Sequence, residues 1–104
     1  MYKLYTDGGS RGNPGPSAIG GILYQDKKII NEFSECIGKA TNNQAEYKAL
    51  IKGLEMAKKQ GIRELDCYLD SELVANQMNR RYKIKDTDLA PLFVKVWNLS
   101  LNFK

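Results

Sequence analysis

Hydrophobic and polar residues alternate along the first part of the chain, and this period of two predicts extended strands. The alternation covers residues 2–7, 18–25 and 28–36, and Asp26 and Lys27 suit the turn of a hairpin between the last two segments. Residues 8–16 contain four glycines and two prolines, which predicts a tight irregular turn. We therefore expect three antiparallel strands in this region.

The hydrophobic period changes from that of a strand to that of a helix after Thr41. Thr41 and the two asparagines that follow it can cap a helix that runs to about residue 60, and Gly61 can end it. Small and apolar residues recur along this segment at helical spacing and predict its buried stripe, namely Ala45, Ala49, Leu50, Gly53, Leu54 and Ala57.

The remaining residues predict one more strand and two more helices. Residues 65–70 alternate as a short strand, Ser71 can cap a helix over about 72–79, and Thr87 or Asp88 can cap a helix through Leu99. The order β-β-β-α-β-α-α predicts an α/β fold, in which helices pack on a mixed sheet and strand–helix–strand crossovers are right-handed. At 104 residues, the chain is expected to form a single domain over 1–104.

Composition narrows the classes of protein to consider. No apolar run approaches the roughly 20 residues of a membrane span, and the first residues lack the apolar segment of a secretion signal, so we expect a cytoplasmic protein. Sixteen Lys and Arg residues against twelve Asp and Glu residues give a net charge of +4, which permits a polyanionic partner.

Histidine is absent, and this limits the chemistry available to the chain. The absence excludes serine–histidine and cysteine–histidine nucleophile pairs, so that carboxylates or a metal ion would have to act instead. Cys36 and Cys67 are far apart and have no further thiol or imidazole beside them, which argues against zinc. We expect both to be reduced, packed thiols.

Three carboxylates occupy positions that point to a shared site. Glu46 lies on or beside the apolar stripe of the predicted helix, and Asp7 and Asp70 each end a predicted strand. If these strands are parallel neighbours, their carboxyl ends bring both aspartates together, and Glu46 in the first helical turn can join them. Hard divalent cations such as Mg²⁺ and Mn²⁺ relieve the repulsion within such a cluster. Each residue alone also fits a structural role, as an edge glutamate or as a turn former.

Three motifs strongly resemble those of the type 1 ribonuclease H family. They are TDGGSRGNPGP at 6–16, TNNQAEY at 41–47 and LDSELV at 69–74, and their order and spacing match over essentially the whole chain. The resemblance implies a mixed five-stranded sheet, with three antiparallel strands followed by parallel strands. It also implies an endonuclease that hydrolyses the RNA strand of RNA–DNA hybrids by a two-metal-ion mechanism and leaves 5′-phosphate ends.

The resemblance assigns roles to particular residues. Asp7, Glu46 and Asp70 would be the catalytic metal ligands for two Mg²⁺ ions, with Mn²⁺ as an alternative, and Asp7 would bridge both ions. Amide side chains at the hybrid suit RNA, because they can donate to and accept from a 2′-hydroxyl, although they also suit turns and helix caps. The residues expected to contact the substrate are Gly8, Gly9, Ser10, Asn13, Asn43, Gln44 and Ser71.

The chain departs from the family at its end. The family continues with a full fifth strand and carries a fourth catalytic aspartate, whereas the chain ends at Lys104, within or just before that strand. We expect an incomplete fifth strand and a weaker second ion. We also expect an exposed sheet edge that favours a homodimer or strand exchange with a second copy.

Two other functions remain open at this stage. A catalytically impaired module or truncated fragment that still binds RNA–DNA hybrids would keep the fold with one metal lost. A transposase or integrase core would share the carboxylates, although the asparagine-rich motifs favour the hybrid-cutting enzymes. The densest basic segment either contacts a hybrid or is a solvated loop, and consists of Arg80, Arg81, Lys83 and Lys85.

Overall fold

The computed structural model describes residues 1–69 and 89–103, which form four strands and two helices. The strands are β1 (Tyr2–Ser10), β2 (Gly15–Gln25), β3 (Lys28–Ala40) and β4 (Asp66–Leu69). The helices are α1 (Asn42–Lys59) and α3 (Ala90–Ser100). The helix predicted over 72–79 lies outside the described residues.

The four strands form one mixed sheet in the order β3-β2-β1-β4. β1 runs antiparallel to β2 and parallel to β4, and β2 runs antiparallel to β3. The predicted α/β class is therefore confirmed, and the first and fourth strands are parallel neighbours, which was the condition for bringing their carboxyl ends together. The fifth strand is not seen among the residues that the structure describes, since Leu101 and Asn102 form a turn after α3.

The strands extend farther than the alternation predicts, so that the turn predicted over 8–16 is wrong in its bounds. β1 continues to Ser10, which pairs with Ser17, and β3 continues to Ala40, which pairs with Gly15. Gly8 and Gly9 stay extended because their backbone groups join the ladder to β2, whereas Gly12 lies in the loop with a φ of 72°. The loop itself spans only residues 11–14.

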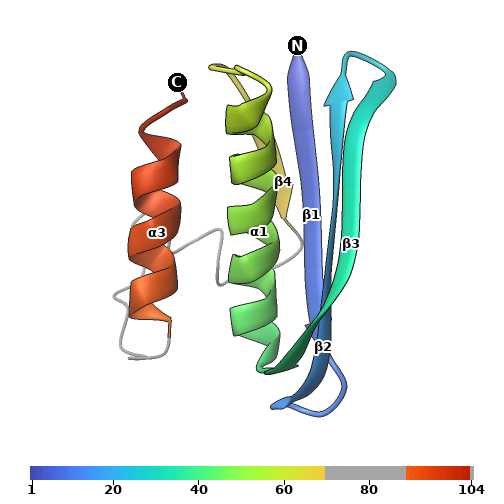
Figure 1. Ribbon diagram of the computed structural model, residues 1–104, viewed down its shortest axis with the longest axis vertical. Coiled ribbons are helices and arrows are strands. Elements are labelled where there is room, and N and C mark those ends of the chain that lie inside the picture. Colours follow the sequence, from blue (N-terminus) through green and yellow to red (C-terminus); the bar gives the residue numbers. More distant parts are fainter. Residues whose placement is uncertain (70–88, 104) are drawn as a thin grey trace.

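Helix α1 lies between the sheet and α3 (Figure 1). Thr41 caps α1 as predicted, with its side chain accepting from the Gln44 N–H while the Gln44 side chain accepts from the Thr41 N–H. The predicted apolar stripe is buried and packs against β1 and β2. Burial of this stripe, with Leu4 and Leu23 from the sheet, supplies the main core of the described structure.

Helix α3 packs mainly against α1, on the side away from the sheet. Val96 is fully buried, and Leu92 and Phe93 pack on the same core. The residue at the start of α3 is Leu89, without a side-chain cap, and a proline occupies the first turn. The capping residues predicted for this helix, Thr87 and Asp88, lie outside the described residues. No described helix has the length and hydrophobicity needed to cross a membrane.

The two cysteines differ in part from the prediction. Cys36 and Cys67 are both free thiols, as expected. Both side chains are exposed, so the expectation that they are packed is wrong. Cys36 lies on β3 and Cys67 on β4, and because these are the outer strands of the sheet as far as the structure describes it, their residues have fewer described neighbours to cover them.

The backbones of β1 and α1 approach each other closely at two glycines. A methyl group on Gly8 would lie 2.3 Å from the carbonyl oxygen of Ala45, which is far inside van der Waals contact. A methyl group on Gly53 would lie 2.8 Å from the Leu4 side chain and 2.9 Å from that of Thr6. The absence of side chains at these positions therefore sets the distance between the helix and the strand.

Gly8→Ala is expected to lower the free energy of unfolding by about 1–3 kcal/mol, because β1 and α1 must move apart to admit the methyl group. Gly9→Ala is the matched control in the same strand, since no atom of the described residues lies within 4 Å of a methyl group there. The control should stay within about 0.5 kcal/mol of the wild type. Urea denaturation measures both, and equal effects of the two substitutions would contradict the close contact.

Candidate active site

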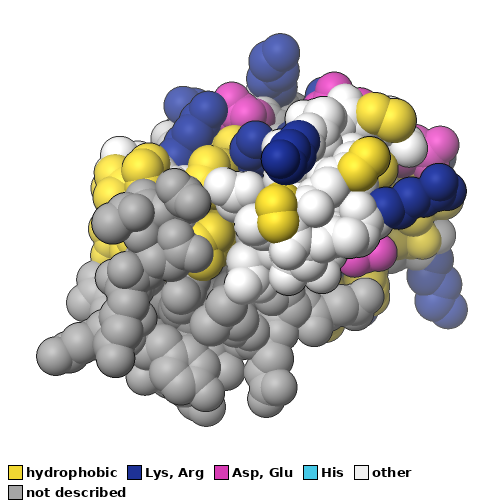
Figure 2. Space-filling view, turned by 90° about the horizontal axis from the view of Figure 1, so that it is seen from below, with side chains coloured by type: hydrophobic (Ala, Val, Ile, Leu, Met, Phe, Trp, Pro, Cys, Tyr) yellow, Lys and Arg dark blue, Asp and Glu magenta, His cyan; other side chains and the backbone are white. Residues whose placement is uncertain are grey.

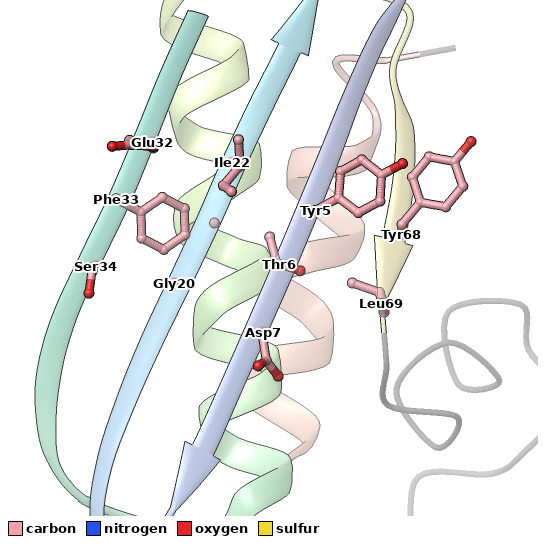
Figure 3. Close-up of a pocket in the computed structure, with 11 residues that line it drawn as sticks. Tyr5, Thr6, Asp7, Gly20, Ile22, Glu32, Phe33, Ser34, Tyr68 and Leu69 are labelled. Carbon is pink, nitrogen blue, oxygen red and sulfur yellow. The ribbon is translucent and has the colours of Figure 1, made fainter. Parts of the chain in front are cut away.

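Asp7 lies on β1 with its side chain exposed. Leu4 and Thr6 are buried toward α1, so the alternation of the strand turns Tyr5 and Asp7 toward the opposite face of the sheet. Figure 3 shows Asp7 farther along β1 than Tyr5, and the ring of Tyr5 beside that of Tyr68. These two rings stack with their centroids 4.7 Å apart.

The exposed face of the sheet carries an open cavity of about 860 Å³ beside Asp7. Its described lining includes the carboxylates of Asp7 and Glu32 but no lysine or arginine. A phosphate group entering this cavity would therefore meet negative charge without a balancing side chain from the lining. The cavity suits a polyanion only when cations accompany it.

Glu46 is buried, with 9% of its surface exposed, although it carries a carboxyl group. One of its carboxylate oxygens, Oε1, accepts a hydrogen bond from the Gly8 N–H at 3.0 Å. That N–H belongs to the peptide bond that joins Asp7 to Gly8. The structure thus brings the Glu46 carboxylate to the backbone beside Asp7, and a hydrogen bond to a carboxylate partly offsets the cost of its burial.

The third predicted carboxylate, Asp70, lies outside the described residues. The parallel pairing of β1 and β4 ends at Thr6 and Leu69, which directly precede Asp7 and Asp70 in the sequence. Within residues 1–69 and 89–103, no group of three acidic, cysteine or histidine side chains is gathered for a metal ion. The described part of the candidate site therefore consists of the pair Asp7 and Glu46.

The loop between β1 and β2 is tied to the start of α1 through side-chain amides. The Asn42 side-chain oxygen accepts from the Ser10 N–H at 2.8 Å, and the Asn13 side-chain oxygen accepts from the Asn42 N–H at 3.0 Å. The Ser10 hydroxyl also donates toward the carbonyl oxygens of Gly12 and Ala40. Ser10 and Asn13, both predicted to contact substrate, thus also hold the loop in place.

The other predicted substrate residues separate into those the structure describes and those it does not. Gln44 belongs to the capping pair with Thr41, and Asn43 is half-exposed in the first turn of α1. Gly9 is exposed on β1, next to Gly8. The predicted residues beyond the described range are Ser71 and the basic segment Arg80, Arg81, Lys83 and Lys85.

At the end of the molecule at which α1 begins, uncharged side chains and backbone form much of the surface that the structure describes. Figure 2 shows this end, with Lys and Arg side chains around its described part and fewer Asp and Glu side chains among them. Gly9, Ser10 and Arg11 line a smaller cavity of about 550 Å³ at the β1–β2 loop. Arg11 therefore adds a positive charge to the loop that carries Asn13.

Comparison with known proteins decides the family. The family model described as "Reverse transcriptase-like" matches residues 5–104. Ribonuclease HI of Halobacterium salinarum is 44% identical over 100 residues, which cover 95% of this chain. The solved N-terminal RNase H domain of a Mycobacterium tuberculosis protein superposes with a TM-score of 0.95 at 42% identity, covering 98% of this chain and 79% of that one. The chain belongs to the type 1 ribonuclease H family.

Two further comparisons bear on this family assignment. A solved RNase H1 in complex with an RNA/DNA hybrid superposes with a TM-score of 0.93 at 38% identity, covering 99% of this chain and 78% of that one. The chain spans only part of its curated relatives, 50% of the halobacterial enzyme and 28% of the mycobacterial protein, which is described as bifunctional. In contrast, the chain covers 79% and 78% of the two solved structures, so it shares its fold with most of each of them.

Sequence reasoning missed Asn42 as a member of the site. The residue lies between Thr41 and Asn43 in the second motif, where capping chemistry explains a run of short polar residues. Its bond to Ser10 spans 32 positions of the sequence, and no local pattern reports such a contact. The only signal in the sequence is that asparagine follows Thr41 directly, although one polar residue is enough to cap the helix.

The pKa of Tyr47, next to Glu46, gives a pH-dependent test of this region. Burial raises the pKa of Tyr47 to about 12 from its ordinary value of 10.0. Between these values the hydroxyl is protonated in the folded chain and ionised in the unfolded chain. Its contribution to stability is therefore complete below pH 10 and is lost as the pH rises through 12.

Tyr47→Phe is expected to flatten the fall of stability between pH 10 and pH 12, measured as urea midpoints at each pH. All other ionisable groups are the same in both proteins, so their effects cancel in the comparison. Tyr24→Phe, at a half-buried tyrosine, is the matched control for loss of a hydroxyl. Parallel pH profiles for wild type and Tyr47→Phe would contradict the prediction.

Proposed function

We propose that this chain hydrolyses the RNA strand of RNA–DNA hybrids with the help of divalent metal ions. The observation that carries the proposal is the Glu46 carboxylate held 3.0 Å from the Gly8 amide nitrogen, directly beside Asp7, in a chain of the ribonuclease H family. A relative of the same fold has been solved with an RNA/DNA hybrid, which supports the same substrate class here.

The donor set of the site fits Mg²⁺ or Mn²⁺. Asp7 offers an exposed carboxylate, and Glu46 offers a second one that is held at the Gly8 N–H, directly after Asp7 in the chain. The cavity beside Asp7 has no cationic side chain in its described lining. Hard divalent cations prefer such oxygen ligands. We propose Asp7, Glu46 and Asp70 as the ligands of two ions.

The chemistry proposed for the site is in-line hydrolysis of a phosphodiester. Metal ions bound there would activate the attacking water and stabilise the leaving oxygen, giving 5′-phosphate ends. The chain's own part is to hold the carboxylates in place. The Gly8 N–H orients Glu46, and the β-ladder with Gly20 orients Asp7.

Recognition of the hybrid is proposed for the amide-rich end of the molecule. Asn13, Asn43 and Gln44 lie at or near the start of α1, in the same region as Glu46. Their amide groups can donate to the acceptors of a minor groove and to a 2′-hydroxyl, which distinguishes RNA from DNA. Gly8, Gly9, Ser10 and Ser71 complete the proposed contact surface.

Asp7→Asn and Glu46→Gln are each expected to lower the rate of hybrid cleavage in Mg²⁺ by more than about a hundredfold, since changes in outer-shell residues alone cost about 10–100-fold. Glu46→Gln keeps an oxygen for the Gly8 N–H, so the fold should persist. A fluorescently labelled RNA strand annealed to DNA reports the cleavage. Glu55→Gln, at an exposed glutamate of the same helix, is the matched control and should cleave like the wild type.

The same assay separates the proposal from its alternatives. Hybrid binding without cleavage, equal in wild type and Asp7→Asn, would indicate an impaired binding module and would sink the enzyme proposal. Cleavage of duplex DNA in preference to the hybrid would indicate a transposase-like or integrase-like core.

Homodimer formation or strand exchange stays a prediction, as does the cytoplasmic location. The described sheet has β3 and β4 at its edges, and exposed edges favour pairing with another chain. A monomeric mass by light scattering at tens of micromolar would contradict the predicted association.

A further inference from the structure

We propose that Asn42 is a positioning residue that fixes the Glu46 carboxylate beside Asp7 by clamping the start of α1 to the end of β1. The inference rests on the proposed metal-dependent function of these two carboxylates. It goes beyond that function because it concerns a residue that needs no contact with the metal ion.

The clamp consists of two hydrogen bonds that run in opposite directions. The Ser10 N–H donates to the Asn42 side-chain oxygen at 2.8 Å, and the Asn42 N–H donates to the Asn13 side-chain oxygen at 3.0 Å. One residue therefore joins three segments, namely the last residue of β1, the β1–β2 loop and the first turn of α1. The N–H of the first helical turn has no partner within the helix, so Asn13 satisfies a donor that α1 leaves open.

The position of the clamp relative to the carboxylates explains its proposed effect. Ser10 follows Asp7 by three residues on β1, and Asn42 precedes Glu46 by four residues, about one turn of helix. The hydrogen bond from Gly8 to Glu46 joins the same strand to the same helix. Fixing Asn42 to Ser10 thus fixes the helical turn from which Glu46 extends, relative to the strand that carries Asp7.

The close approach at Gly8 does not by itself fix this turn. The contact of Gly8 with the Ala45 carbonyl limits how near the helix can come, but it does not prevent the helix from sliding or tilting away. Directional hydrogen bonds supply that restraint. Because both bonds lie at the surface, each contributes modestly to stability, and variants of Asn42 should fold.

The side-chain atom that matters is the oxygen of Asn42, since its partner is an N–H donor. Asn42→Ala removes this acceptor, whereas Asn42→Asp keeps an oxygen in the same place. The two variants therefore separate the clamp from the amide N–H donors of Asn42, because both variants lack these donors.

The test measures binding of Mg²⁺ alone, without substrate, from the chemical shifts of the Gly8 and Gly9 amides in NMR titrations. Asn42→Ala should weaken Mg²⁺ binding about tenfold, as expected for loss of a group that orients a metal ligand. Asn42→Asp should bind at least as tightly as the wild type. The Ser10 amide should exchange slowly with solvent in wild type and Asn42→Asp, and faster in Asn42→Ala.

A second set of variants controls for charge, since Asn42→Asp adds a negative charge near the ions. Asn43→Asp adds the same charge at the next residue and leaves Asn42 in place. The double variant Asn42→Ala with Asn43→Asp should remain weak in Mg²⁺ binding if the acceptor oxygen is responsible. Full rescue by this double variant would show that charge, not position, sets the affinity, and would overturn the clamp.

The outcomes distinguish failure of the clamp from failure of the proposed function. Equal Mg²⁺ affinity of wild type and folded Asn42→Ala overturns the clamp, whether or not the wild type cleaves hybrids. Weak binding by Asn42→Ala, with a wild type that binds Mg²⁺ but cleaves no hybrid, supports the clamp and overturns the function. A wild type that binds no Mg²⁺ overturns both.

Discussion

The close approach of α1 to β1 is the constraint on which the rest of the described structure depends. At Gly8 the two backbones come so near that a methyl group would collide with the Ala45 carbonyl. This distance lets a glutamate from the helix reach an N–H of the strand, and it lets the ends of both elements exchange hydrogen bonds. A wider gap would leave Glu46 buried without that partner, which would raise the cost of its charge.

Two kinds of force hold the opposite ends of this helix–strand pair. Burial of apolar side chains around Leu4, Leu23 and Leu54 stabilises the contact between α1 and the sheet away from the start of the helix. This contribution depends on buried area and tolerates small shifts of the helix. Polar bonds at Ser10, Asn42 and Glu46 hold the near end, where direction matters more than area. The candidate site thus lies at the end of the helix that is held by hydrogen bonds.

Much of the arrangement could be predicted from the sequence because it follows from periodicity. The stripe of α1 and its capping by Thr41 have local signals, and these signals place Glu46 in the first turn of the helix, at its buried side. The end of β1 could not be predicted, because the glycine-rich residues 8–10 have the composition of a turn and are extended only through their pairing with β2. The end of β3 likewise depends on pairing with the start of β2. The N-cap of α3 at Leu89 and the contact of Asn42 with Ser10 also depend on residues distant in the sequence.

The exposure of the two thiols has a practical consequence for measurement. Cys36 and Cys67 lie on β3 and β4, the outermost strands on either side of the described sheet. β1, which carries Asp7, runs between them, next to β4 and separated from β3 by β2. The native chain therefore already holds two attachment points for spectroscopic labels, from which the width of the sheet can be followed while a ligand occupies the face between them.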